Sequence, residues 1–401
     1  MKPLKYLFIS SMLFVATSCG NSWLDLEPST SVDTETSIKI LSDVEFTLNG
    51  IYSTMQSSDA YSGRLVYYGD VTGDDMQAVS STKRVANYYR FNFTKDDNPS
   101  SHWSYLYSII QNCNLILMNI DKLVIDEDDK AYRDDLKGEA LAIRGLALFD
   151  LTRIFGYPYL KDNGASLGVP IIEGLSTIDS KPTRNTVAQC YTKIIDDLTQ
   201  SLSLLGEKFN KGKINKWGAM VLLSRVYLYK GENANALKMA SDAIIGAEKN
   251  KYALWTNEDY PTAWGEDASA SKPGEVLFEI VNLTTDSPGK ESMGYLNSYD
   301  GYDDMCITCS FYQFLKEDPK DIRLKLLSFD KKYYAYVNKY QPQREENIED
   351  ANIPLIRLSE AYLNAAEAAV KENDNDAAVK YLDPIAVSYT HLRAHETTLH
   401  L

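Results

Sequence analysis

Apolar residues recur at helical spacing along much of this 401-residue chain. The pattern is strongest over 138–160, where two neighbouring apolar stripes run along one helix: Ala140, Ile143, Ala147, Leu151 and Ile154 form the first, and Leu141, Leu148 and Phe155 the second. The alanines and Gly145 make this helix thin enough for others to approach closely, and Gly156 with Pro158 ends it. The pattern therefore predicts a buried helix around which the chain is organised.

The same spacing predicts further helices over 33–57, 102–123, 187–205 and 213–229. Asn185 or Thr186 can cap the third of these, and Gly231 ends the fourth. In contrast, residues 61–98 are polar and poorly periodic, which predicts a loop with short irregular pieces.

An internal repeat appears in the second half of the chain. Leu-Ser-x2-Tyr-Leu occurs at 223–228 and again at 358–363, and each copy is followed by a short Asn- and Ala-containing segment, at 233–237 and 375–379. The gap is longer in the second copy by roughly two helical turns, so the facing surfaces keep the same phase. Helix, turn and helix in repetition predict a mostly α, tetratricopeptide-like fold of stacked hairpins.

A segment of different character, 251–350, separates the two copies. Sixteen of the 90 residues 251–340 are aromatic, and proline and glycine interrupt any helical pattern. Residues 275–281 alternate as in a short strand. We therefore expect a loop-rich insertion on the helical scaffold, where binding functions usually lie.

The chain ends carry signals that are separate from the fold. Lys2 and Lys5, an apolar run and small residues before Cys19 predict a lipoprotein signal peptide over 1–18, lipidation of Cys19 and a lipid-anchored tether over 19–34. The alternative is an ordinary signal peptide followed by an incidental cysteine. His391, His395 and His400 lie within the last residues, but we predict that 386–401 is an artefactual tail, because 387–401 resembles translated sequencing-adapter read-through.

Charge and motifs exclude several function classes. The formal net charge is −15 without an offsetting basic cluster, which excludes nucleic acid as a partner. No motif typical of hydrolases, nucleotide binding or metalloenzymes is found, so we predict no catalysis, no cofactor and no metal. Asp74-Asp75 and Asp303-Asp304 could supply a glycosidase carboxylate pair, but adjacent residues point apart.

The cysteines do not predict a redox or zinc site. Cys306 and Cys309 are spaced as C-x2-C, but a second pair and a βαβ context are missing, which leaves a local disulfide or two incidental thiols. Cys113 and Cys190 lie on apolar helix faces and are expected in the core. Arg144 and Glu139 are expected to form a structural ion pair between repeats.

Sugar binding requires flat aromatic faces surrounded by side chains that satisfy hydroxyl groups. Two stretches, 74–103 and 295–302, offer that mixture. The candidate ligand-binding residues are Asp75, Arg84, Asn87, Tyr89, Tyr295, Asn297, Tyr299 and Tyr302. Each of them could equally serve packing, and so could Trp103, which begins a helix.

Several segments resemble one protein family in chain order. EALAIRGLALFDLTRIFGYPYL, KINKWGAMVLLSRVYLYKG and NIPLIRLSEAYLN are similar to segments of the SusD/RagB-like nutrient-uptake lipoproteins of bacterial outer membranes. The resemblance implies one SusD-like α-helical domain over 35–385, anchored at the cell surface. It also implies capture of an oligosaccharide, whose sites in the family fall in loops of the two stretches above, and delivery to a SusC-like TonB-dependent transporter.

Two other functions remain open from the residues alone. A tetratricopeptide-type scaffold that binds a peptide or protein would present a concave groove lined by Asn, Lys and Arg, whereas an aromatic loop face favours sugar. A glycosidase would release new reducing ends from oligosaccharides.

Overall fold

The computed structural model describes residues 37–94, 100–177, 179–265, 273–332, 334–342 and 347–389. The predicted signal peptide, Cys19, the tether and residues 390–401 lie outside this part of the chain. Residues 386–389 of the predicted tail continue the last helix, where the Ser388 hydroxyl bonds the carbonyl oxygen of Trp255. Among the described residues, no helix combines the length and apolar content needed to cross a membrane.

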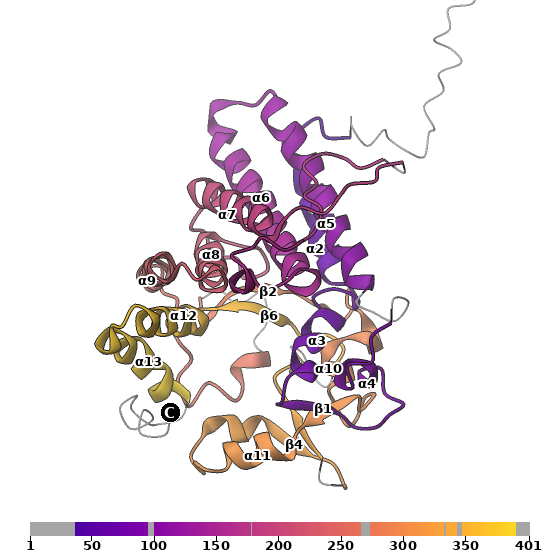
Figure 1. The fold of residues 1–401 in the computed structure, drawn as a ribbon, viewed down its shortest axis with the longest axis vertical. Helices are drawn as coiled ribbons and strands as arrows, with labels where there is room; N and C mark the ends of the chain where they lie inside the picture. The colour runs from indigo at the N-terminus through magenta and orange to yellow at the C-terminus, as the bar shows by residue number, and fades with distance from the viewer. Residues whose placement is uncertain are drawn as a thin grey trace, which may run out of the picture.

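Consecutive helices packed against one another form the body of the molecule (Figure 1). They are α2 (Leu41–Met55), α5 (Ser100–Asn119), α6 (Lys130–Phe155), α7 (Val187–Leu204), α8 (Lys216–Lys230), α9 (Asn233–Lys249), α12 (Leu358–Lys371) and α13 (Asn375–Tyr389). Each of α5 to α9 contacts the next, and α12 packs on both α9 and α13. This arrangement confirms the predicted mostly α, tetratricopeptide-like fold.

Helix α6 is buried on all sides over most of its length, as the sequence predicts. Its glycines explain how α7 packs so closely. A Cβ atom at Gly138 would lie 2.9 Å from Cγ of Leu205, and one at Gly145 would lie 3.0 Å from Cγ of Leu198. The helix begins at Lys130, before the apolar stripes start. The sequence pattern did not predict these first turns, because they are largely polar and lack the apolar periodicity.

A buried ion pair joins the helices around α6. Arg144 donates to both carboxylate oxygens of Asp197 on α7, at 2.8 and 2.6 Å, and to the side-chain oxygen of Asn114 on α5 at 2.8 Å. Arg144 therefore forms the expected ion pair between helices, but Glu139 is not its partner. Glu139 accepts a hydrogen bond from the Tyr52 hydroxyl at 2.7 Å.

Local sequence signals set the ends of several helices. Thr186, one of the two predicted caps, forms a capping box with Gln189 at the start of α7. Asn215 accepts a hydrogen bond from the Gly218 amide and so begins α8. Gly231 ends α8 with φ at +81°, a left-handed conformation that favours glycine.

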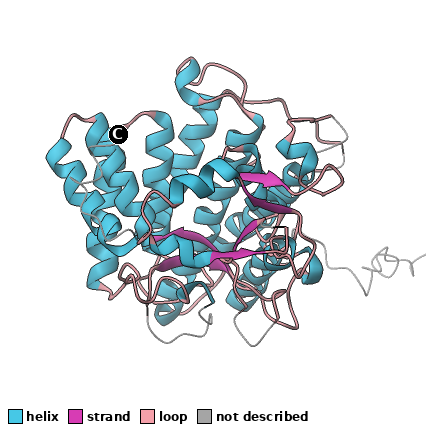
Figure 2. Ribbon diagram, turned by 90° about the horizontal axis from the view of Figure 1, so that it is seen from below, coloured by secondary structure: helices cyan, strands magenta, loops and turns pink. Residues whose placement is uncertain are grey.

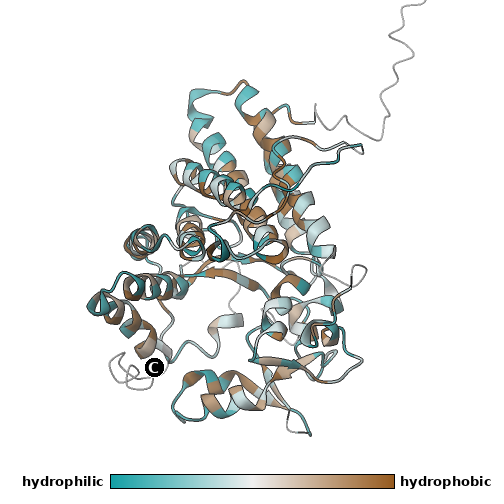
Figure 3. Cartoon of the chain, viewed as in Figure 1, coloured by the Kyte–Doolittle hydropathy of each residue, from teal (hydrophilic) through white to brown (hydrophobic). Residues whose placement is uncertain are grey.

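The repeated signatures lie on equivalent helices, α8 and α12, and each is followed by a hairpin partner, α9 or α13. The two copies also touch. The Asn364 amide donates to the Ser224 hydroxyl at 2.9 Å, and Arg225 forms a two-pronged ion pair with Glu360 at 2.5 and 2.7 Å. Apolar and polar residues alternate along the helices of the body (Figure 3). Apolar residues of α8, α9 and α12 are buried where these helices pack on one another, so neither hairpin buries its apolar face alone.

Short strands, magenta in Figure 2, lie among the helices and form three two-stranded sheets in the described part of the chain. Antiparallel strands β2 (Val276–Ile280) and β6 (Ile353–Arg357) flank residues 281–352, which make up most of the predicted insertion 251–350. Between them, the insertion contains α10 (Met293–Leu296), β3 (Met305–Ile307), α11 (Cys309–Leu315), β4 (Leu327–Phe329) and β5 (Ala335–Val337). It packs on an N-terminal segment that contains α3 (Arg64–Thr72), β1 (Met76–Ala78) and α4 (Ala86–Tyr89).

Helix α3 was not expected from the sequence, which predicted a loop over 61–98. Its only fully buried side chains are Tyr67 and Val71, one turn apart. Gly69 and Asp70 interrupt the apolar pattern, and both residues are exposed. The helix is therefore stabilised by its packing on neighbouring segments and not by local helix propensity.

Candidate functional site

Two segments that are far apart in the sequence meet at the insertion. Strands β1 and β3 pair in antiparallel register, with Met76 opposite Ile307. This pairing places the predicted ligand-binding stretches 74–103 and 295–302 beside each other. The structure therefore assembles a possible binding surface from parts that no local pattern connects.

Arg84 is the centre of this surface. Its guanidinium carbon lies over the Tyr302 ring, 3.9 Å from the ring centroid, in cation–π contact. The rings of Tyr302 and Tyr295 are 4.9 Å apart and meet edge to face at 79°. The Arg84 side chain is held by Asp304 and Glu291, each at 3.2 Å. We call Arg84, Tyr295 and Tyr302 the arginine–tyrosine cluster.

The carboxylates beside the cluster fix the arginine and balance its charge. Asp304 is almost fully buried, and burial raises its pKa, although Arg84 and Lys83 oppose that effect. Lys83 also lies 3.6 Å from Asp303 and bonds the Tyr302 carbonyl oxygen at 2.5 Å. The cluster therefore presents oriented donors and aromatic rings without a large net charge.

Two other predicted tyrosines are accessible. Tyr89 at the end of α4 is 38% exposed, and Tyr299 is 45% exposed with its ring 5.8 Å from that of Tyr336. Asn87 is exposed on α4 as well. These side chains leave aromatic and amide surface open to a ligand.

Two phenylalanines that were not predicted as site residues follow Tyr89 closely in the sequence. Phe91 is 64% exposed and Phe93 38% exposed, and their rings are 6.2 Å apart. Phe91 has φ at +53°, a strained conformation for a bulky residue, which is often found at functional sites. The available signal was the density of aromatic residues in an otherwise polar stretch, 88–93.

Asp75 and Asn297 do not join the arginine–tyrosine cluster. Both line a separate cavity of about 270 Å³ between α3, β1 and the insertion. Asn297 is only 4% exposed, and its amide nitrogen donates to the Val337 carbonyl oxygen at 2.6 Å. Trp103 packs on Tyr107 and Phe155 in the helical body, at ring distances of 4.9 and 5.0 Å.

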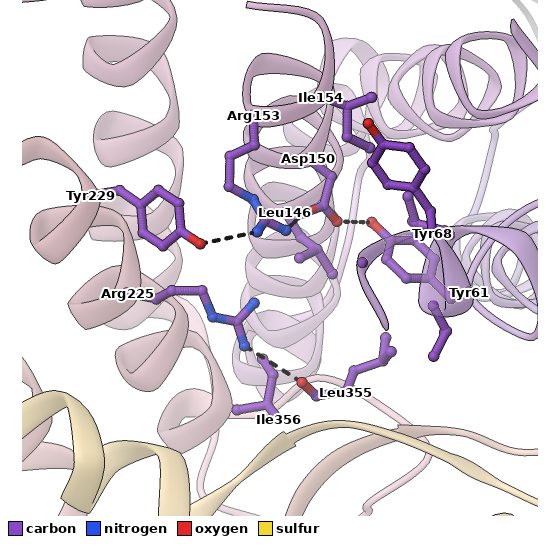
Figure 4. A pocket seen from close by; sticks show the side chains of 13 residues that line it. Tyr61, Tyr68, Leu146, Asp150, Arg153, Ile154, Arg225, Tyr229, Leu355 and Ile356 are labelled. Atoms are coloured by element: carbon purple, nitrogen blue, oxygen red, sulfur yellow. Dashed lines mark hydrogen bonds and ion pairs between the residues drawn. The ribbon is translucent and has the colours of Figure 1, made fainter. Parts of the chain in front are cut away.

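A cleft of about 380 Å³, lined by both apolar and charged residues, lies where α3, α6, α8 and β6 meet (Figure 4). Its walls carry Tyr61, whose hydroxyl donates to Asp150 at 2.7 Å, and Arg153, which bonds Asp150 and the Tyr229 hydroxyl. Burial raises the pKa of Tyr61, and the Asp150 carboxylate adds to this effect. Arg225 faces the same cleft.

Each arginine of this cleft is matched by a carboxylate. Burial lowers the pKa of Arg153, but the Asp150 carboxylate raises it by more. Burial and the Glu360 carboxylate act in the same two directions on the pKa of Arg225, which is also raised. Both arginines therefore stay charged and paired. We interpret the cleft as a structural contact region, in which paired polar side chains hold α3 in place on the helical body.

One of the two carboxylate pairs considered for glycosidase chemistry, Asp303-Asp304, is engaged in other contacts. Asp304 binds Arg84, and Asp303 accepts a hydrogen bond from the Tyr336 hydroxyl. Within the described part of the chain, no group of three or more His, Cys, Asp or Glu residues could hold a metal ion. Cys306 is a buried free thiol, and Cys309 is an exposed free thiol at the start of α11.

The sequence also predicted that two cysteines, Cys113 and Cys190, lie in the core. Cys113 and Cys190 are fully buried, as expected for apolar helix faces. Burial raises the pKa of the Cys113 thiol to about 12, so this group is unreactive at neutral pH.

Comparison with known families gives two matches. Residues 22–228 match a family model described as starch-binding and associating with the outer membrane, and residues 326–400 match the SusD family model. The second match overlaps residues 386–400, so the artefactual origin of that stretch stays a prediction.

Individual relatives agree with these matches. The chain is similar to SusD-like protein P2 of Formosa agariphila, with 28% identity over 75% of this chain and 57% of the relative. It spans about half the length of the curated relatives it matches. Among solved structures, a Bacteroides vulgatus ATCC 8482 protein with a provisional sugar-binding assignment is 79% identical, with a TM-score of 0.88 over 91% of this chain and 82% of that one.

A second solved structure from Bacteroides vulgatus ATCC 8482 is described as a SusD superfamily protein. It is 35% identical to this chain, with a TM-score of 0.83 over 88% of this chain and 81% of the other. The similarity therefore extends over both the helical body and the insertion.

Proposed function

Because the chain belongs to the SusD family of proteins associated with the outer membrane, we propose that it binds an oligosaccharide at the cell surface and delivers it to a SusC-like TonB-dependent transporter. In this mechanism no covalent bond is made or broken. The insertion holds the glycan, and a face of the helical body docks on the transporter.

The geometry of the arginine–tyrosine cluster carries the sugar-binding proposal. A pyranose ring has apolar C–H faces and a rim of hydroxyl groups, so it requires an aromatic face beside fixed polar groups. Tyr302 and Tyr295 supply the rings, and Arg84 is an oriented donor beside them. Tyr89 and Tyr299, on the same two predicted stretches, are further exposed aromatic side chains. An aromatic surface on the insertion favours sugar over peptide as the ligand.

Charge favours a neutral oligosaccharide over an acidic one. The formal net charge of the chain is −15. The positive charge of Arg84 is already balanced by Asp304 and Glu291, so no free cation of the cluster remains for a polyanionic glycan.

Membrane attachment is proposed to occur through lipid on Cys19. The tether 19–34 would then connect the anchor to the single domain 35–385, with 251–350 as its loop-rich insertion. Two acyl chains hold a protein firmly at a membrane. This attachment would keep the insertion near the mouth of the transporter.

The proposal is tested by calorimetric titration of the purified full-length chain with a panel of neutral oligosaccharides. We expect saturable binding by at least one of them, and a roughly five- to tenfold loss of affinity in each of Tyr89→Ala, Tyr299→Ala and Tyr302→Ala, because a stacked ring is worth about 1 kcal/mol. Tyr132→Ala is the matched control, since Tyr132 is 41% exposed on α6.

Two outcomes would overturn the proposal. The first is binding that none of the three site variants affects. The second is the appearance of new reducing ends during incubation, which would show glycosidase activity.

A further inference from the structure

One lysine, Lys339, lines the cavity that also contains Asp75. It lies just after β5, and its side chain is partly exposed. Its nitrogen lies 5.1 Å from the centroid of the Trp264 ring. Within the described part of the chain, Lys339 takes part in no hydrogen bond and no ion pair. The nitrogen is also not one of the fully buried unpaired polar atoms of the described residues, so it stays within reach of small solutes.

The charged groups around the Lys339 amine indicate which cavity it faces. Asp70, Asp75 and Arg323 all line the cavity of Asp75. All three also act electrostatically on Lys339, so they lie close to its amine. Among the described residues around the adjoining cavity of about 340 Å³ is Tyr340 but not Lys339. The amine therefore lies among the groups that line the cavity of Asp75.

The surroundings of Lys339 favour the neutral amine. Burial lowers the pKa of Lys339 to about 8, and Arg357 and Arg323 add to this effect. Asp70 and Asp75 oppose it, but neither forms an ion pair with the amine. At about pH 7.5, a pKa of about 8 leaves roughly one quarter of the amine neutral, compared with about one part in a thousand for an ordinary lysine. Because only the neutral amine is a nucleophile, Lys339 is poised to attack a carbonyl carbon.

The apolar part of the lining limits the size and polarity of the carbonyl compound. This part is buried and consists largely of flexible methionine and leucine side chains, which adapt to varied shapes: Met76, Met293, Met305, Leu315 and Leu326. The cavity volume of about 270 Å³ is near the lower end of the range for ligand pockets. The interior therefore suits an apolar body of about one ring.

The charged part of the lining disfavours an anion. Arg323 is already bonded to Asp321, with its Nε at 2.9 and 3.0 Å from the two carboxylate oxygens. The charged groups that remain in the lining are Asp70, Asp75 and Lys339. Two carboxylates against one amine leave the cavity with a negative balance, so a neutral carbonyl compound is favoured over an acidic one.

We propose that Lys339 captures small neutral aldehydes inside this cavity, as a reversible imine. The amine nitrogen attacks the carbonyl carbon, and one proton moves from nitrogen to oxygen to give a carbinolamine. The hydroxyl group then leaves with the second amine proton as one water molecule, and the C=N bond forms. The step needs no oxidant or reductant. It stands apart from glycan binding, because it depends on different residues and a different ligand class.

The test traps the imine on the purified full-length chain with 4-methylbenzaldehyde and sodium cyanoborohydride, which reduces the imine to a stable amine. Peptide mapping by mass spectrometry measures the labelling rate of each lysine and separates them from the α-amino group. At about pH 7.5 we expect Lys339 to be labelled at least about tenfold faster than Lys332, which is exposed in the turn before β5. The ratio of the two rates should fall above about pH 8, because Lys339 is then largely neutral whereas an ordinary lysine is still charged.

A pair of variants and a second aldehyde locate the reaction. Lys339→Arg is expected to remove the fast labelling, and Lys332→Arg, the same change at an exposed position, to leave it unchanged. With 4-formylbenzoate, which carries a carboxylate on the same ring, we expect the rate at Lys339 relative to Lys332 to fall at least about fivefold. If Lys339→Arg does not fold, the two aldehydes and the pH series on the wild type decide alone.

Three outcomes would overturn the proposal. The first is equal labelling of Lys339 and Lys332, or no labelling of Lys339. The second is a rate ratio that does not change with pH. The third is an equal preference of Lys339 for the neutral and the anionic aldehyde.

Discussion

The guanidinium of Arg84 lies over the ring of Tyr302, with its carbon 3.9 Å from the ring centroid. The two residues come from separate segments, which the pairing of β1 with β3 holds together. Asp304 and Glu291 hold the guanidinium in place through hydrogen bonds. The ring surface proposed for the sugar is therefore formed before a ligand arrives, which lowers the entropic cost of binding.

Replacing Arg84 by lysine keeps the charge but removes the planar group that covers the ring. We expect Arg84→Lys to weaken oligosaccharide binding roughly fivefold, because a lysine does not reproduce both the stacking and the forked hydrogen bonds. The free energy of unfolding should change by less than about 1 kcal/mol, since the ion pairs of Arg84 are partly exposed. Calorimetry and urea unfolding measure the two effects. Arg90→Lys, at an exposed position nearby, is the control, and equal affinities of the two variants would contradict the prediction.

Two glycines are expected to respond oppositely to alanine. A Cβ atom at Gly145 would lie 3.0 Å from Cγ of Leu198, so Gly145→Ala should destabilise the fold by about 1–3 kcal/mol through overpacking. At Gly50, within α2, a Cβ atom meets nothing within 4 Å, and Gly50→Ala should stabilise by about 0.5–1 kcal/mol. Urea unfolding of both variants provides the measurement, and a change of the same sign in both would refute the packing argument.

Arg144 is expected to be critical for stability. Arg144→Met leaves Asp197 buried beside Lys193 alone, 3.2 Å away, and should cost about 3 kcal/mol. Removing both charges in Arg144→Met with Asp197→Leu should recover much of that loss, because the buried carboxylate is then absent. A double-mutant cycle in urea measures the coupling between the two residues. Additive losses would show that the pair is not coupled.

Glu139 should make stability depend on pH. Burial raises the pKa of Glu139 from 4.5 to about 7, against the opposing effect of Lys213 and the hydrogen bond from Tyr52. A raised acid pKa means that the folded state binds the proton more tightly, so stability falls as pH rises from 4.5 to 7. The loss, about 3 kcal/mol, is complete above pH 7.

Glu139→Gln should remove this dependence. The variant is expected to match the wild type near pH 4 and to exceed its free energy of unfolding by about 3 kcal/mol at pH 8. Urea unfolding across this range measures the difference. Parallel pH profiles of the two proteins would contradict the raised pKa.

Lipidation of Cys19 can be tested in bacterial cells that are fed an alkyne-labelled palmitate. We expect label on the wild-type chain, no label on Cys19→Ala, and release of that variant from the membrane fraction. Cys309→Ala removes an exposed thiol on the folded domain and should leave labelling intact. Label retained in Cys19→Ala would place the lipid elsewhere.

Helix positions were predictable from the sequence wherever the buried residues recur with the period of an α-helix. The stripes of α6, the Thr186 cap and the Gly231 stop are local signals, and each has the predicted role. Helix α3 and strand β6 were missed, because tertiary contacts stabilise them. In β6, Ile353 pairs with Ile280 of a strand far away in the sequence.

The candidate site was predictable as a set of residue types but not as a geometry. Arg84 and Tyr302 were predicted as separate candidates, and only the pairing of β1 with β3 brings the two side chains into contact. The same reasoning grouped Asn297 with Tyr295, although Asn297 lines the cavity beside Met293 whereas Tyr295 contacts Tyr302. Proximity in sequence carries no information about which face of a short helix a side chain occupies when no periodic pattern surrounds it.

Strands β2 and β6 place Val276 opposite Arg357, so the chain departs from the helical scaffold and returns to it at adjacent points. Lengthening a segment whose ends already meet costs little, since the closure entropy grows only with the logarithm of its length. The length of residues 281–352 can therefore change at little entropic cost to the stacked hairpins. One helical scaffold would thus tolerate insertions of different lengths between the same two strands.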